Sequence, residues 1–240
     1  MNILITGGAS GLGKAITETL AENKKNTVYF TYSKSEEKAN KIKTIFENTI
    51  SIKCDFSDPS ELQSLQDQIK EMDLDVLINN AYCSKINQMH FHKCPPIDFL
   101  SDFKDNIIPT IIITQEVIKL FRKKKNGKIV TILSSYLSNV PPTGLSSYVA
   151  NKAYLGKLTK SWANENSKFN IASNSISPSF MQTGLTVDVD ERVVEQMILN
   201  HPNKNLITPK EVAEAVMFLA NAGNHINGVD ILMNAGVNIK

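Results

Sequence analysis

The sequence predicts an α/β fold with a doubly wound, mostly parallel sheet that carries helices on both faces. Short apolar runs alternate with amphipathic stretches along the chain, as strands alternate with crossover helices in such folds. These runs are apolar nearly throughout, which is typical of strands buried on both sides. Polar or turn-forming residues follow successive strands, and the carboxyl ends of parallel strands line one ligand-binding edge.

Each element can be placed from its own pattern. Strands are expected at residues 2–6, 26–32, 49–55, 74–80, 127–135, 169–178 and 228–234. Helices are expected up to about residue 23, at 36–48, from 59 to about 71, from about 97 to 124, around Tyr148, and at 209–222. Asp58 suits the N-cap of the third helix and Pro59 its first turn. Residues 81–96 are predicted to form a loop, and residues 179–207 an irregular or partly helical segment.

The composition suits a single globular domain over residues 1–240. The chain is 42% hydrophobic and has a net charge of +2, from 26 basic and 24 acidic residues, which argues against nucleic acid as a main partner. Its longest apolar runs fall short of the roughly 20 residues that cross a bilayer, so no membrane association is expected. The first residues do not read as a signal peptide. Three cysteines without framework spacing, Cys54, Cys83 and Cys94, favour reduced thiols in a cytoplasmic protein.

A glycine-rich turn follows the first predicted strand. Gly7, Gly11 and Gly13 in TGGASGLG permit a tight turn and a close backbone approach, and the helix that starts there favours a pyrophosphate at its N-terminus. The spacing is G-x3-G-x-G rather than the commoner G-x-G-x-x-G. Such a turn can be purely structural, but its place between a first strand and a helix predicts a dinucleotide site.

Tyr148 and Lys152 lie four residues apart in SSYVANKAYLG, and Ser135 lies thirteen positions before the tyrosine. Residues four apart share one face of a helix. An ammonium beside a phenol favours the phenolate and lowers the tyrosine pKa from about 10, so the side chain can exchange a proton near neutral pH. A Y-x-x-x-K pair alone is common. Together with the glycine turn it predicts a nicotinamide-dependent oxidoreductase.

These motifs together resemble the short-chain dehydrogenase/reductase family in its single-domain form. The resemblance covers nearly the whole chain, and it implies seven strands in the order 3-2-1-4-5-6-7. The matched elements, in family order, are TGGASGLG, Asp55, Asn79-Asn80-Ala81, Asn106, Ser135, Tyr148 to Lys152, and Pro178 to Thr183.

The resemblance also implies catalytic roles. Tyr148 would give its proton to the carbonyl oxygen, and Lys152 would lower the tyrosine pKa and hydrogen-bond the nicotinamide ribose. Ser135 would hydrogen-bond the carbonyl oxygen; neighbouring Ser134 is the alternative, and the thirteen-residue offset favours Ser135. Asn106 would hold a water of a proton relay, or else accompany a helix bend ahead of a proline.

Cofactor contacts follow from the same resemblance. They are Gly7, Ser10, Gly11, Leu12, Gly13, Thr31, Ser33, Lys34, Asp55, Phe56, Asn80, Ala81, Tyr148, Lys152, Pro178, Ser179, Met181 and Thr183. An acidic residue after the second strand would grip the ribose 2′-hydroxyl of NAD(H). This chain has Ser33 and Lys34 there, which can bind a 2′-phosphate. NADP(H) is therefore favoured over NAD(H), although Ser10 stands where many NADPH-using relatives have a basic residue.

Three departures from the family pattern leave the substrate open. Tyr82 and Ser179 stand where glycine is usual, and Asn234-Ala235-Gly236 replaces a terminal Asp-Gly-Gly. Candidate substrates are a 3-oxoacyl thioester, a steroid-like ketone, and a sugar or polyol ketone. The alternative to an enzyme is a dinucleotide sensor without turnover, or an inactive partner subunit of another reductase.

Further segments have candidate roles. Residues 184–206 are expected to form a lid that closes over the substrate, or a helix packed on the core or on a subunit. The basic run from Arg122 to Lys125, with Lys128 and Lys168, is either a solvated helix end or a docking site for an acidic carrier protein. By resemblance we expect a homotetramer or dimer formed through the helices that bear Asn106 and Tyr148.

A metal site is not expected. Cys83, His90, His92 and Cys94 gather in the loop after the fourth strand, but their spacing does not match the paired-ligand pattern of zinc sites.

Overall fold

The computed structural model describes residues 1–83, 88–138, 140–183, 186 and 189–237. Its strands form one parallel sheet of seven strands in the order β3-β2-β1-β4-β5-β6-β7, which confirms the predicted fold class and strand order. The strands are β1 (Asn2–Ile5), β2 (Thr27–Tyr32), β3 (Thr49–Lys53), β4 (Val76–Asn79), β5 (Gly127–Ile132), β6 (Ile171–Pro178) and β7 (Asp230–Met233).

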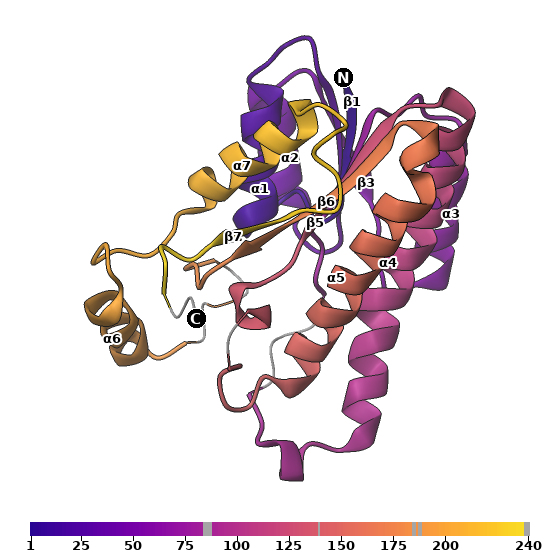
Figure 1. The fold of residues 1–240 in the computed structure, drawn as a ribbon. Helices are drawn as coiled ribbons and strands as arrows, with labels where there is room; N and C mark the ends of the chain where they lie inside the picture. The colour runs from indigo at the N-terminus through magenta and orange to yellow at the C-terminus, as the bar shows by residue number, and fades with distance from the viewer. Residues whose placement is uncertain (84–87, 139, 184–185, 187–188, 238–240) are drawn as a thin grey trace.

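The helices cover both faces of the sheet (Figure 1). Side chains that alternate along a strand point to opposite faces. Ile3 and Ile5 accordingly belong to a core with α1, α2 and α7, whereas Leu4 belongs to a second core with α3, α4 and α5. These helices are α1 (Gly11–Ala21), α2 (Glu36–Ile45), α3 (Pro59–Lys70), α4 (Pro96–Lys124), α5 (Ser146–Asn166) and α7 (Pro209–Asn221).

Local chemistry fixes several helix boundaries. The Asp58 carboxylate accepts hydrogen bonds from the backbone N–H groups of Ser60 and Glu61, and Pro59 follows it in the first turn of α3, as predicted. Thr208 and Glu211 form a capping box at the start of α7.

All seven strands are shorter than predicted, and at two of them the structure shows why. The fifth strand ends at Ile132, because the chain turns into a short 3₁₀ helix, η2 (Ser135–Leu137), which the Ser134 side chain caps. The sixth begins only at Ile171, because η3 (Ser167–Phe169) ends on Asn170 in the left-handed conformation with φ 60°. The predicted loop 81–96 contains another 3₁₀ helix, η1 (Phe91–Lys93), in its described part.

Figure 1 also shows α6 (Glu191–Asn200) standing away from both helix layers. It lies in the segment predicted as a lid, of which residues 184, 185, 187 and 188 fall outside the described part. Val194 of α6 is buried and Val193 is 45% exposed. The predicted helix is therefore present, whereas its closure over a substrate stays a prediction.

Candidate active site

The glycine turn after β1 has the backbone that the motif predicts. Gly7 and Gly11 have φ values of 68° and 52°, in the left-handed region that favours glycine. A Cβ at Gly13 would collide with the carbonyl oxygen of Gly7 and with the Asn80 side chain. Gly8, which the motif analysis did not single out, is equally constrained, because a Cβ there would press on Phe30 and Thr17.

The N-terminus of α1 opens directly after this turn. Ser10 is its N-cap residue, is exposed, and makes no side-chain capping hydrogen bond. The first-turn N–H groups, those of Gly11 and Leu12 among them, have no partner within the helix. This end of α1 is suited to an anion such as a pyrophosphate.

Thr31 and Asn80, both predicted to contact the cofactor, brace the glycine turn. The Thr31 hydroxyl accepts a hydrogen bond from the Gly7 N–H (2.9 Å) and its carbonyl accepts one from the Gly8 N–H (2.8 Å). The Asn80 amide donates to the carbonyl oxygens of Thr6 (2.9 Å) and Gly7 (3.1 Å). Because Thr31 is only 1% exposed, its side chain supports the turn from within.

Thr6, the first residue of the TGGASGLG motif, is a further support to which the motif assigned no role. Its hydroxyl accepts hydrogen bonds from the backbone N–H groups of Asn80 and Ala81, both at 3.0 Å. The residue type alone gave no signal for this role.

Asp55 and Ser33 meet after β3 and β2. The Ser33 hydroxyl donates to the Asp55 carboxylate (2.7 Å), and the Ser57 hydroxyl (2.7 Å) and N–H (3.0 Å) donate to its other oxygen. These bonds, first that of the Ser57 hydroxyl, hold the pKa of Asp55 below its usual value, and the nearby Lys34 charge adds to the effect. Phe56 next to it is buried. The structure thus places a carboxylate beside the predicted 2′-phosphate site.

Tyr148 lies in the first turn of α5, facing the end of β5. It is partly exposed, yet desolvation of its phenol raises the pKa to about 12, opposed by a hydrogen bond with the Ser134 hydroxyl. The direction is opposite to the one expected from Lys152 alone. Burial penalises the phenolate more than the available contacts favour it.

The two candidate serines have different positions relative to Tyr148. Ser135 is the first residue of η2 and is buried. Ser134 is the N-cap residue of this turn, and its hydroxyl accepts a hydrogen bond from the Tyr136 N–H (3.3 Å). The Ser134 side chain also interacts with the Tyr148 phenol. The thirteen-residue offset assumes one length for the loop between η2 and α5. Ser134 therefore interacts with the Tyr148 phenol, and the assignment of the catalytic role to Ser135 stays a prediction.

Lys152 lies one turn further along α5 and is 4% exposed. Its ammonium donates a hydrogen bond to the carbonyl oxygen of Ile132 (2.8 Å), and burial lowers its pKa to about 8. The ammonium nitrogen is 5.9 Å from the centroid of the Tyr148 ring and 5.3 Å from that of the Tyr82 ring. The predicted catalytic pair is therefore brought together, with Tyr82 as a third member.

Tyr82 packs edge-on against Tyr148, with ring centroids 5.1 Å apart and an interplanar angle of 73°. Burial raises the pKa of its phenol, and the nearby Asn151 side chain opposes this shift. The sequence marked Tyr82 as a departure from the family pattern but did not show that it contacts both catalytic candidates.

Asn106 lies inside α4 and is 1% exposed. Its side-chain oxygen accepts a hydrogen bond from the Cys83 N–H (2.6 Å), and its amide nitrogen donates to the Asp102 carbonyl (2.9 Å). Asn106 thereby holds the segment that carries Tyr82. Its part in a proton relay stays a prediction.

The segment after β6 is also at this edge. The Ser179 N–H donates to the Met233 carbonyl (2.9 Å), which ties Pro178-Ser179 to β7. The Thr186 hydroxyl donates to the Met181 carbonyl (2.7 Å) and accepts from the Thr183 N–H (2.9 Å). Contacts of these residues with a cofactor stay predictions.

Comparisons with known proteins show the family of this chain. A protein-family model described as enoyl-(acyl carrier protein) reductase matches residues 7–238. The 3-oxoacyl-(acyl-carrier-protein) reductase FabG of Buchnera aphidicola subsp. Baizongia pistaciae is 32% identical over 98% of this chain and 96% of its own length. The enzyme of that name from Staphylococcus aureus is 30% identical, with the same coverage. This chain belongs to the short-chain dehydrogenase/reductase family.

Solved structures support the fold of this family member. A 3-ketoacyl-(acyl-carrier-protein) reductase from Brucella melitensis complexed with NADH has a TM-score of 0.87 and 21% identity, over 99% of this chain and 98% of that one. A putative gluconate dehydrogenase from Agrobacterium tumefaciens has a TM-score of 0.89 and 22% identity, over 100% of this chain and 96% of that one.

The family assignment makes this protein an oxidoreductase that uses a nicotinamide dinucleotide to interconvert carbonyl and alcohol groups. The alternative of an inactive sensor or partner subunit is not favoured. Among the described residues no helix is long and apolar enough to cross a membrane. Within the same residues, no cluster of His, Cys, Asp and Glu side chains could hold a metal ion.

The basic run of this reductase lies far from Tyr148. It ends α4, next to the start of β5 and hence at the opposite edge of the sheet. The ammonium of Lys124 pairs with Asp73 (2.7 Å) and Asp75 (2.6 Å), and Arg122 donates to the Asn166 side chain (2.7 Å). Lys123 and Lys125 are exposed. The lysines at this end can meet an acidic surface, but not next to the site of their own chain.

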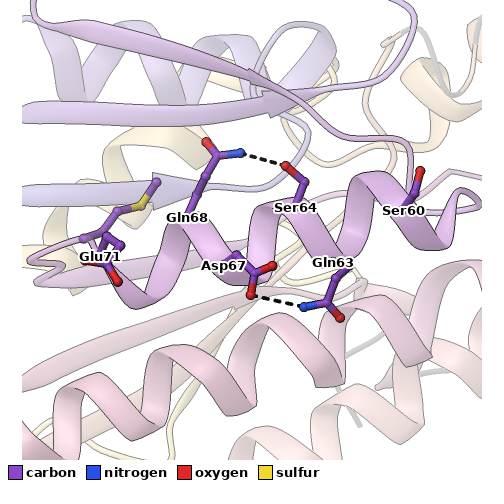
Figure 2. Close-up of a pocket in the computed structure, with 7 residues that line it drawn as sticks. Ser60, Gln63, Ser64, Asp67, Gln68 and Glu71 are labelled. Carbon is purple, nitrogen blue, oxygen red and sulfur yellow. Dashed lines mark hydrogen bonds between the residues drawn. The ribbon is translucent and has the colours of Figure 1, made fainter.

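A depression on the outer side of α3 is separate from the site as well. Figure 2 shows its lining side chains, among them Gln63, Ser64 and Gln68. They hydrogen-bond along the helix, from Gln63 to Asp67 (3.2 Å) and from Gln68 to Ser64 (3.3 Å). None of them belongs to the dinucleotide or tyrosine motifs, so this depression is not the candidate active site.

Proposed function

We propose that this reductase reduces a 3-oxoacyl thioester to the 3-hydroxyacyl thioester, with NADPH as the preferred reductant. The observation that carries the proposal is the cluster of Tyr148, Ser134 and Lys152 at the same sheet edge as the glycine turn. The names of the full-length bacterial relatives support the substrate class.

The residues after β1 and β2 fit the cofactor. The N-terminus of α1, which opens after the left-handed turn at Gly7 and Gly11, suits a pyrophosphate. When bound, the nicotinamide supplies a hydride to the carbonyl carbon. Lys34 and Ser33 favour a 2′-phosphate, and the carboxylate of Asp55 next to Ser33 limits that preference by repulsion.

The chain's own groups handle the carbonyl oxygen. The Ser134 hydroxyl donates a hydrogen bond to it, and Tyr148 transfers its phenolic proton as negative charge develops there. A phenol with a pKa of about 12 is fully protonated at neutral pH and still more acidic than an alcohol. The ammonium of Lys152 then stabilises the phenolate, which regains its proton from water.

The test is oxidation of NADPH and NADH by the purified protein with acetoacetyl thioesters, cyclic ketones, diketones and keto-sugars. We expect turnover with the thioesters and NADPH, and its loss in Tyr148→Phe, which keeps the ring and removes the proton. Turnover confined to another carbonyl class overturns the substrate. Turnover that Tyr148→Phe leaves unchanged overturns the mechanism.

We propose an oligomer formed through α4 and α5. Both helices expose large apolar side chains, including Leu100 (62% exposed) and Tyr154 (45%). Antiparallel pairing of two copies of α4 brings the basic end of one chain toward the site of the other, where Lys123 and Lys125 can receive an acidic carrier protein. Sedimentation of the wild type and Leu100→Glu tests the assembly, because a charge at the contact should dissociate it.

We also propose that the protein resides in the cytoplasm and that α6 closes over the substrate. Cys54, Cys83 and Cys94 are all free thiols, which suits a reducing compartment.

Closure of α6 over the substrate predicts that α6 becomes more protected from hydrogen exchange when cofactor and substrate bind.

A further inference from the structure

We propose that Tyr82 is a positioning residue that keeps the Lys152 ammonium charged and aligned beside Tyr148. The Lys152 ammonium lies over the Tyr82 ring. The same ring packs edge-to-face with the ring of Tyr148. This inference concerns a residue of this chain where the family usually has glycine, and it rests on the proposed function only for its consequence in catalysis.

The first step is the position of the ammonium. Lys152 is almost fully buried, and its nitrogen has the Ile132 carbonyl at 2.8 Å as its hydrogen-bond acceptor. Within the described residues it forms no ion pair with a carboxylate. A buried ammonium without a counter-ion loses its proton readily unless other contacts favour the charged form.

The second step is the pair of aromatic rings. The ammonium nitrogen lies 5.3 Å from the Tyr82 centroid and 5.9 Å from the Tyr148 centroid. Both distances are within the range at which the negative face of an aromatic ring attracts a cation, and the attraction strengthens in a desolvated site. Of the two rings, that of Tyr82 is the nearer.

The third step is that Tyr82 is itself held in place. It is partly buried near Asn151, the residue before Lys152 on α5. The N–H of Cys83, which follows Tyr82, donates to the Asn106 side chain at 2.6 Å. The Tyr82 ring meets Tyr148 at 73°, a favourable edge-to-face arrangement. Other groups nearby act on the two tyrosines: the Asp102 charge acts on Tyr82, and Tyr136 acts on Tyr148.

The test measures the ionisation of Lys152 directly, in protein free of cofactor. Protein labelled with ¹³C at the lysine Cε is titrated by NMR, and the Lys152 signal is assigned by its absence in Lys152→Met. Tyr82→Leu keeps an apolar side chain and removes the ring, so we expect the titration midpoint to fall by about one pH unit. Tyr82→Phe keeps the ring and should leave the midpoint unchanged.

Two controls make the outcome specific. Tyr154→Leu removes an exposed ring of the same helix, which packs on Phe103 5.1 Å away, and should not move the midpoint. Tyr82→Met is a second ring-free variant in case Tyr82→Leu does not fold. An unchanged midpoint in the folded ring-free variants, or an equal shift in Tyr82→Phe, overturns the proposal.

Kinetics then connect the inference to catalysis. We expect the alkaline limb of kcat/KM for thioester reduction to move to lower pH in Tyr82→Leu and to return in Tyr82→Phe. A shifted NMR midpoint without turnover on any carbonyl would uphold the role of Tyr82 and reject the proposed function. An unchanged NMR midpoint in the ring-free variants, together with full turnover on thioesters, would reject the role of Tyr82 and uphold the proposed function.

Discussion

The hydroxyl of Ser134 hydrogen-bonds to the phenol of Tyr148 across the space between the end of β5 and the first turn of α5. Two hydroxyl groups that meet in this way can both donate to one carbonyl oxygen placed between them. Such a pair orients the carbonyl and offers it a proton in the same geometry. This contact favours Ser134 as the serine that orients the carbonyl, whereas the thirteen-residue offset in the sequence favours Ser135.

Ser134→Ala is expected to lower kcat/KM for carbonyl reduction by about 100-fold, because one donor to the developing oxyanion is lost. Ser135→Ala is the matched control, since Ser135 is equally buried but one residue further into η2. Steady-state kinetics of both variants check this. A large loss in Ser135→Ala together with an active Ser134→Ala would restore the assignment made from the sequence.

The sequence could predict the fold because its signals are local. An apolar run followed by an amphipathic stretch identifies a buried strand and its crossover helix, and the residues after the strands must then share an edge. Asp55 and Asn80 are predicted at this edge in this way, whereas Tyr148 is predicted from its spacing to Lys152. Each of them follows or faces a strand end that periodicity alone can locate.

The contacts that were missed depend on distances across the fold. Nothing near Asn106 in the chain shows that its side chain accepts the Cys83 N–H, and nothing near Thr31 shows that its hydroxyl holds Gly7. The choice of serine depends on the length of the loop before α5. The pKa of Tyr148 depends on how much water the folded chain excludes, which spacing does not report.

Lys34→Glu is expected to weaken NADPH binding by about tenfold or more and to leave NADH binding nearly unchanged. The reason is charge: the substitution replaces attraction of a 2′-phosphate by repulsion, while NADH carries a hydroxyl at that position. Nucleotide fluorescence titration measures both affinities. Lys38→Glu, an exposed lysine on α2, is the control; equal weakening of both nucleotides by Lys34→Glu would contradict the preference for NADPH.

Gly13→Ala is expected to destabilise the protein by about 2 kcal/mol and to abolish dinucleotide binding. The added methyl group meets the Gly7 carbonyl and the Asn80 amide, so the turn must shift or the chain must strain. Thermal unfolding with and without nucleotide checks both effects. Gly223→Ala, where a Cβ has open space around it, should bind the dinucleotide normally. If Gly13→Ala kept its stability and its dinucleotide affinity, the role of Gly13 in the turn would be contradicted.

Lys152→Met is expected to stabilise the folded protein at pH 7 while it abolishes turnover. The folded-state pKa of Lys152 is about 8, against an ordinary value of 10.5. Burying the ammonium therefore disfavours folding below pH 8, and this penalty is relieved as pH rises toward 10.5, because the unfolded chain then binds the extra proton. The difference corresponds to about 3 kcal/mol, and loss of the hydrogen bond to Ile132 leaves a net gain of about 2 kcal/mol.

Denaturant unfolding between pH 7 and pH 10 tests this sign. The stability advantage of Lys152→Met over the wild type should be largest at pH 7 and should shrink above pH 8. Lys157→Met, an exposed lysine on the same helix, should show neither effect. If Lys152→Met instead destabilised the protein at every pH, the prediction would be wrong. The hydrogen bond and ring contacts of Lys152 would then outweigh its desolvation, and Lys152 would stabilise the fold.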